Sequence, residues 1–117
     1  PCTGAEEGCQ IGDLFRILGK AHMLDILAMF IHENQGPLRF VDIQNRLGLS
    51  PNTLSERLKE LVEAGLLTRT AYNEIPPRVD YDATTKAHEL EPVFHTLAEW
   101  ARRHTLKAQA EPDKATA

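Results

Sequence analysis

The sequence predicts a mostly α-helical domain that carries one small β-hairpin. Apolar residues recur at helical spacing through most of the chain, and one stretch alternates as strands do on both sides of a proline-containing loop. Of the 117 residues, 42% are hydrophobic and 26% are charged, which is typical of an ordinary globular domain. A chain of this length is expected to form one domain around one hydrophobic core.

The composition argues against several classes of protein. The longest apolar stretch, residues 23–31, contains Asp25 and is too short to cross a bilayer. No basic-then-apolar leader opens the chain, so we expect a cytoplasmic protein without a membrane partner. Two cysteines cannot form a disulfide framework. The net charge of -4 gives no whole-chain reason to expect a nucleic-acid partner, so that hypothesis depends on where the cations lie.

The chain divides into three parts by composition. Residues 1–10 are small, polar and acidic, and are expected to form a flexible arm, while the polar residues 109–117 are expected to be a disordered tail. The folded domain is expected over residues 11–108. It begins with a helix from Ile11 to Leu18 and a second from Ala21 to Ile31, whose apolar residues lie on two sides. Such a helix is normally buried between others, so the second helix is expected to be the central support.

Two short helices joined by a tight turn follow. Phe40, Ile43 and Leu47 lie on one helical face, and Gly48 suits a backbone with positive φ. Ser50-Pro51 is typical of a helix start, because the serine hydroxyl can cap the helix and proline is favoured in the first turn. The leucines of this second helix continue along one face until Gly65, which is suited to end the helix. This pattern predicts a helix-turn-helix, and a generic helical hairpin is the alternative.

A β-hairpin follows directly. The pattern predicts two strands, Leu66–Tyr72 and Arg78–Ala83, around the loop 73–77. Thr84 then begins a long last helix, which we expect to bend at Pro92. A hairpin in this position is the wing of a winged helix. The predicted fold is therefore a winged helix-turn-helix, mostly α with a small β wing.

The outward residues at the start of the second motif helix are candidates for reading base edges in the major groove. Asparagine can read adenine, arginine can read guanine, and serine or threonine can contact bases or phosphate. The alternative is a plain solvated helix face. The candidates are Ser50, Asn52, Thr53, Ser55, Glu56 and Arg57.

Nearby cations favour the DNA hypothesis. In the predicted fold, arginines flank the motif and lie on the wing strands, where they can neutralise phosphates, although acidic wing residues dilute this charge. A winged helix that binds only a protein partner is the alternative. The candidates for the DNA backbone or minor groove are Arg39, Arg46, Arg69, Tyr72 and Arg78.

The chain resembles the HxlR-type family of winged helix-turn-helix transcriptional regulators, from Cys9 to the end of the last helix. The matching residues are 36–40, 49–50, 54–55, 58–61, 63–67, Arg69, Tyr72, the segment 75–81 with its proline-proline-arginine wing, and Thr84. The family pattern differs at Gln10, His22 and Ala87, where proline, tryptophan and glycine are usual. The resemblance implies a DNA-binding homodimer, paired through its first and last helices, that is not an enzyme.

The apolar stripes on those two helices independently favour a homodimer, which would place two reading helices about 34 Å apart on an inverted-repeat operator. An ordinary intramolecular stripe is the alternative. The candidate interface consists of Leu14, Phe15, Leu18, Leu90, Val93, Phe94, Leu97 and Trp100.

Cys9 is the candidate for redox chemistry. It precedes the first helix, whose dipole lowers a thiol pKa, but neighbouring acidic residues raise it, so an unreactive thiol is the alternative. Some members of the resembled family sense oxidants or electrophiles through a cysteine at this position. His88, Glu91 and His95 share a helix face but lack a fourth metal ligand, which favours surface histidines. We expect no metal, cofactor or catalytic constellation.

Overall fold

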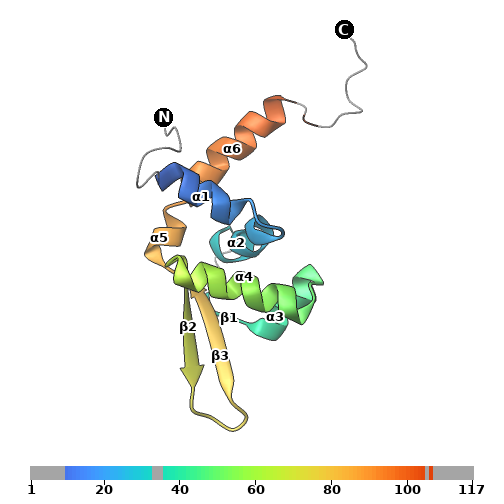
Figure 1. Ribbon diagram of the computed structural model, residues 1–117, viewed down its shortest axis with the longest axis vertical. Coiled ribbons are helices and arrows are strands. Elements are labelled where there is room, and N and C mark those ends of the chain that lie inside the picture. The colour runs from blue at the N-terminus through green and yellow to red at the C-terminus, as the bar shows by residue number, and fades with distance from the viewer. Residues whose placement is uncertain (1–9, 33–35, 105, 107–117) are drawn as a thin grey trace.

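The computed structural model describes residues 10–32, 36–104 and 106. Their helices and strands follow the order expected for a winged helix-turn-helix (Figure 1). The elements are α1 (Gln10–Leu18), α2 (Met23–Ile31), β1 (Leu38–Arg39), α3 (Phe40–Leu47), α4 (Pro51–Glu63), β2 (Leu67–Tyr72), β3 (Arg78–Ala83), α5 (Thr85–His88) and α6 (Glu91–Arg103). The predicted fold class is confirmed. The expected flexible arm and disordered tail lie almost entirely outside the described residues, and Gln10 already belongs to α1.

Helix α2 is the central support of the domain, as its apolar pattern predicts. It lies between α1 and the helix-turn-helix (Figure 1), and most of its side chains are buried. Met23, Ile26 and Leu27 are completely inaccessible and join the leucines of α4 in one core. Leu24, in contrast, faces outward and is half exposed.

The turn between α3 and α4 has the geometry that its sequence predicts. Gly48 has a φ of 66°, a left-handed conformation that glycine adopts at little cost, and its N–H donates to the carbonyl of Gln44. The Ser50 hydroxyl then caps α4 by accepting from the N–H of Thr53 at 3.2 Å. Leu54, Leu58 and Leu61 bury one face of α4 in the core, so the opposite face points to solvent.

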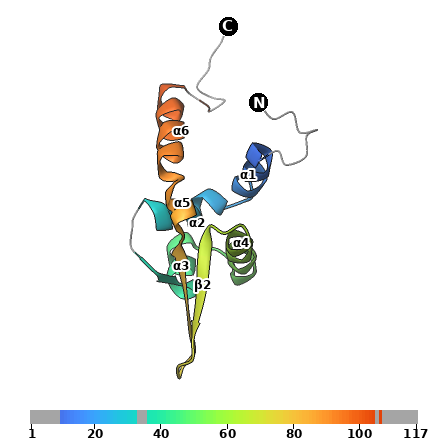
Figure 2. The ribbon, with the colours of Figure 1, turned by 90° about the vertical axis from the view of Figure 1, so that its left-hand side faces the viewer.

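The wing is a three-stranded antiparallel sheet in the order β1-β3-β2. Its long hairpin pairs Leu67 with Ala83 at the base and Tyr72 with Arg78 near the tip. The short β1 pairs Leu38 with Tyr81 and Arg39 with Asp80. The hairpin projects away from the helices (Figure 2), so its tip is exposed on all sides.

The C-terminal region differs from the single bent helix that we expected. Thr84 caps a short α5 by accepting from the N–H of Ala87, and α6 begins anew at Glu91. Pro92 lies in the first turn of α6, where its missing N–H costs nothing, so it starts a helix rather than bending one. Helix α6 then leaves the body of the domain, and none of its side chains is fully buried (Figures 1 and 2).

Within the described residues, no helix has the length and apolar character needed to span a membrane.

The cap of α4 yields a stability prediction. Ser50→Ala removes the side-chain acceptor of the Thr53 N–H and should lower the free energy of unfolding by about 1 kcal/mol. Ser55→Ala, the same substitution on the exposed face of that helix, should change it by less than about 0.5 kcal/mol. Urea unfolding of both variants measures the difference, and equal midpoints would contradict the capping role.

Candidate nucleic-acid interface

The solvent-facing side of α4 presents most of the residues expected to read DNA. Asn52, Ser55 and Glu56 are exposed, and Thr53 is partly exposed. Ser50 is also exposed, but its hydroxyl caps the helix and donates to the Thr53 hydroxyl oxygen at 3.0 Å. The first turn of α4 is therefore open, and no described part of the chain covers it.

Arg57 has partners that its sequence position does not predict. Its Nε donates to the carbonyl of Ala21 at 3.0 Å, and its Nη1 lies 3.3 Å from Glu60. The Arg57 side chain is only 18% exposed. It therefore faces the turn between α1 and α2, away from the open first turn of α4, unlike the other candidates on this helix.

An arginine cluster lies on the wing around one carboxylate. Asp80 lies 3.4 Å from Arg78 on its own strand and 4.0 Å from Arg39 on the neighbouring β1. The guanidinium of Arg78 also lies 4.1 Å from the centre of the Tyr72 ring, a cation–π geometry, and 4.0 Å from Glu74. Interactions with Tyr72, and then with Asp80 and Glu74, raise the pKa of Arg78. Both arginines were expected on this surface, whereas Asp80, one of the acidic residues of the wing, was expected only to reduce its positive charge.

A cleft between α4 and the wing brings further candidates together. Its volume is about 410 Å³, and it is lined in part by Ser55 and Lys59 from α4 and by Arg69 from β2. Ser55 and Arg69 were both expected to contact DNA, and here they line one surface. Lys59 was missed, although its position one turn after Ser55 on a helix is the signal that places it there. Arg46, at the end of α3, is exposed.

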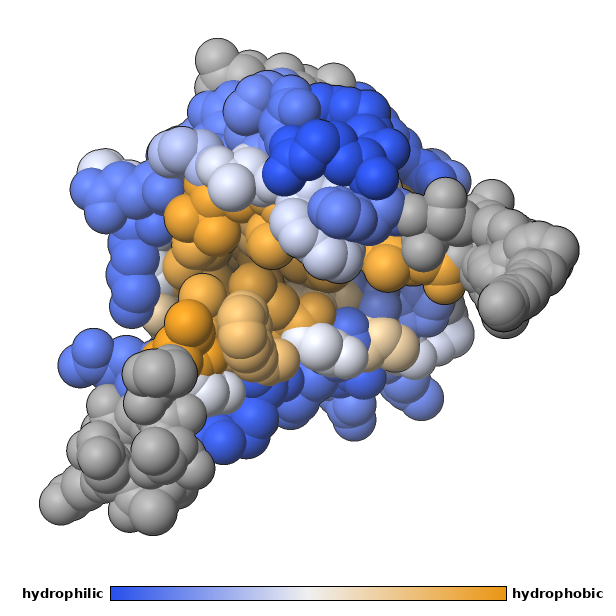
Figure 3. All heavy atoms as spheres, turned by 90° about the horizontal axis from the view of Figure 1, so that it is seen from above, coloured by the Kyte–Doolittle hydropathy of each residue, from blue (hydrophilic) through white to orange (hydrophobic). Residues whose placement is uncertain are grey.

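Seven of the eight residues expected at a dimer interface fall into two groups. Phe15, Val93, Leu97 and Trp100 are exposed, with 59% of Phe15 and 53% of Leu97 accessible. Seen from the end of the molecule that carries α1 and α6, hydrophobic side chains line a hollow (Figure 3). Leu14, Leu90 and Phe94 are partly buried against the core.

Leu18 is a correction to the expected interface. Its side chain is 8% exposed and packs inside the domain's own core, so it is not available to a second subunit.

The expected redox residue Cys9 lies outside the described residues. No group of three potential metal ligands occurs in the part of the chain that the structure describes. His95 instead lies 3.7 Å from Glu99 on the exposed surface of α6.

A helix-turn-helix with an open second helix, flanked by an arginine-bearing hairpin, defines the winged helix-turn-helix class. The profile of the HxlR-like helix-turn-helix family matches residues 17–109. The chain belongs to this family.

Curated relatives are consistent with this assignment. The HTH-type transcriptional regulator BH0655 of Halalkalibacterium halodurans is 38% identical over 64% of this chain and 66% of its own length. The regulator Mb3122 of Mycobacterium bovis is 32% identical over 92% of this chain and 66% of its own length. The chain thus spans slightly less than two thirds of the length of these relatives.

Solved structures share the fold. The reduced form of the transcriptional regulator YodB from B. subtilis superimposes with a TM-score of 0.74 and 31% identity, covering 82% of this chain and 92% of that one. The diamide-treated form of YodB gives a TM-score of 0.69 and 29% identity, covering 84% and 95%.

Proposed function

We propose that this protein is a sequence-specific DNA-binding transcriptional regulator that acts as a homodimer on an inverted-repeat operator. The observation that carries the proposal is the open first turn of α4 beside the arginines of the wing. An α-helix fits the major groove of B-DNA and reads base edges with residues near its N-terminus. Asn52, Thr53, Ser55 and Glu56 are the reading residues in this proposal.

The wing and the cleft beside α4 supply contacts to the DNA backbone. Arg39, Arg69 and Arg78 lie on the sheet that flanks the recognition helix, and Lys59 shares the cleft with Arg69. Phosphate contacts need only a local group of cations, so the acidic net charge of the whole chain does not oppose them. Arg46 at the end of α3 and Tyr72 on β2 complete the proposed contact surface.

Helix α6 supports the homodimer. A helix of 13 residues is marginally stable in water by itself, and α6 has no fully buried side chain, with only Phe94 packed partly against the domain core. Val93, Leu97 and Trp100 of α6 and Phe15 of α1 are exposed, and the two helices lie at the same end of the molecule (Figure 1). A second copy of the chain can cover both apolar stripes through a two-fold contact, which pairs the same surface on each subunit.

Selection of binding sites from a pool of random duplexes tests the function directly. We expect an inverted repeat whose half-sites are separated by about one helical turn, 34 Å, or a multiple of it. If no sequence is enriched and the protein passes through a heparin column without retention, the alternative is favoured, in which the winged helix binds only a protein partner.

Arg78→Ala should weaken binding to the selected operator and to random DNA by similar factors. A wing arginine that neutralises one phosphate contributes about 0.9 to the slope of log affinity against log salt, so the slope should become shallower by about that amount. Arg102→Ala, an exposed arginine on α6, is the control and should leave the slope unchanged. Loss of affinity at a single base pair would point to direct reading by the wing.

Leu97→Asp should convert the dimer to a monomer at micromolar concentration, because it buries a charge in the proposed apolar interface. Ile75→Asp introduces the same charge at a fully exposed position on the wing tip and should leave the dimer intact. Analytical ultracentrifugation measures both masses, and an unchanged Leu97→Asp dimer would refute this interface.

The family also motivates a redox response through Cys9. The diamide-treated YodB structure belongs to a protein 29% identical to this chain, and Cys9 directly precedes α1 in the sequence. Diamide should lower the DNA affinity of the parent chain and of Cys2→Ser but not of Cys9→Ser. A Cys9→Ser variant that responds like the parent would remove Cys9 as the sensor.

A further inference from the structure

The side of α4 that faces away from the wing is bonded to the turn between α1 and α2. We name this group of contacts the α1–α4 clamp, and it consists of Lys20, Ala21, Arg57 and Glu60. Neither the helix-turn-helix pattern nor the proposed DNA contacts account for it. Its members are separated by 36 and 40 residues in sequence.

Both carboxylate oxygens of Glu60 are used in the clamp. One oxygen accepts from the Lys20 Nζ at 2.7 Å, and the other lies 3.3 Å from the Arg57 Nη1. The Arg57 Nε then donates to the backbone carbonyl of Ala21 at 3.0 Å. The hydrogen bond from Lys20, and then the charges of Lys20 and Arg57, lower the pKa of Glu60 despite some desolvation.

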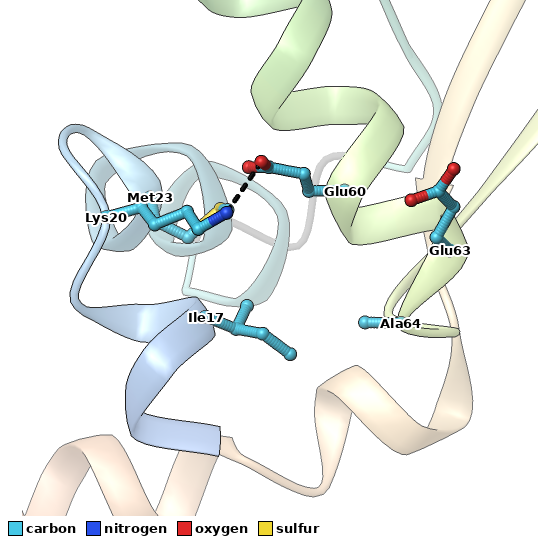
Figure 4. Close-up of a pocket in the computed structure, with 6 residues that line it drawn as sticks. All are labelled: Ile17, Lys20, Met23, Glu60, Glu63 and Ala64. Atoms are coloured by element: carbon cyan, nitrogen blue, oxygen red, sulfur yellow. Dashed lines mark hydrogen bonds and ion pairs between the residues drawn. The ribbon is translucent and has the colours of Figure 1, made fainter. Parts of the chain in front are cut away.

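Apolar packing between α1 and α4 is incomplete beside the clamp. A cavity of about 270 Å³ lies there, and Ile17 of α1 and Ala64 at the end of α4 line it (Figure 4). The backbone of α1 lies mainly against α2 rather than α4. The side-chain bonds of the clamp therefore connect the turn that follows α1 directly to the recognition helix.

The turn that receives these bonds is closed by a backbone hydrogen bond. His22 adopts a left-handed conformation with a φ of 68°, and the Met23 N–H donates to the Lys20 carbonyl at 3.1 Å. This shape points the Ala21 carbonyl at Arg57 and brings the Lys20 ammonium to Glu60. A displacement of this turn relative to α4 would therefore break the clamp.

We propose that Lys20, Arg57 and Glu60 are positioning residues that fix the recognition helix relative to the dimer-facing helix α1. The proposal rests on the proposed DNA-binding function and extends it. Arg57 acts from the side of α4 that faces the α1–α2 turn, by holding α4 at the angle at which its open first turn meets DNA. The clamp thereby makes the spacing of two recognition helices in a dimer depend on the position of α1.

Two variants with opposite charge changes test this role. Glu60→Gln and Lys20→Met should each lower the ratio of operator affinity to random-duplex affinity about tenfold, because a helix held at the wrong angle loses base contacts before phosphate contacts. A purely electrostatic effect would move the affinity for random DNA in opposite directions in the two variants. The double variant should lose no more than the worse single variant, because both substitutions remove the same interaction.

Glu63→Gln is the matched control. Glu63 lies on the same helix and is exposed, and its substitution changes the net charge as Glu60→Gln does. The affinity ratio of this control should stay within about twofold of the parent ratio, the variation expected of a neutral surface change. An equal loss in Glu63→Gln, or no loss in Glu60→Gln and Lys20→Met, would overturn the positioning role.

Hydrogen–deuterium exchange of the protein without DNA separates failure of the clamp from failure of the proposed function. The amides of the α1–α2 turn should exchange faster in Glu60→Gln and Lys20→Met than in the parent or Glu63→Gln, while exchange in β2 and β3 stays the same. Unchanged exchange in the turn would overturn the clamp itself. If the parent chain selects no DNA sequence, the proposed function fails, and the exchange result still decides whether the clamp holds the turn.

Discussion

Burial of one face of α4 is the constraint on which the rest of the molecule depends. Leu54, Leu58 and Leu61 are completely inaccessible and share a core with α2. Because a helix has one rotational setting that buries all three leucines, the same packing turns Asn52, Ser55 and Glu56 to solvent. The surface that is available for recognition is thus determined by the hydrophobic effect before any polar contact is made.

Local signals in the sequence were sufficient to predict much of the fold. Gly48 predicts the turn because glycine adopts a positive φ at little cost, and Ser50 predicts the cap because its hydroxyl can accept from a free helix N–H group. Both residues have the predicted role in the structure. The last helix was misjudged at Pro92, since proline inside a helix and proline in its first turn look alike until the helix start is known. Leu18 was misjudged because an apolar stripe does not specify which neighbour covers it.

Only part of the candidate site could be predicted from local sequence patterns. Ser55 and Glu56 could be placed from helical spacing alone. The partners of Arg57 could not, because Ala21 lies 36 residues earlier and its carbonyl is presented only after the turn at His22 has formed. The contacts of Asp80 could be predicted only from the strand register, which pairs Arg39 with Asp80. That register depends on tertiary structure. Long-range polar contacts of this kind leave no periodic trace in a single sequence.

The base of the wing is fastened to the end of α4 by backbone and side-chain bonds. The Thr84 N–H donates to the Leu66 carbonyl at 3.1 Å, its hydroxyl donates to the Gly65 carbonyl at 2.8 Å, and the Lys86 Nζ donates to the Ala64 carbonyl at 2.8 Å. Residues 73–77 at the far end contribute nothing to this anchorage and are exposed. Extra residues can therefore be accommodated at the tip without disturbing the scaffold, which makes this loop a natural place for grafting a foreign peptide.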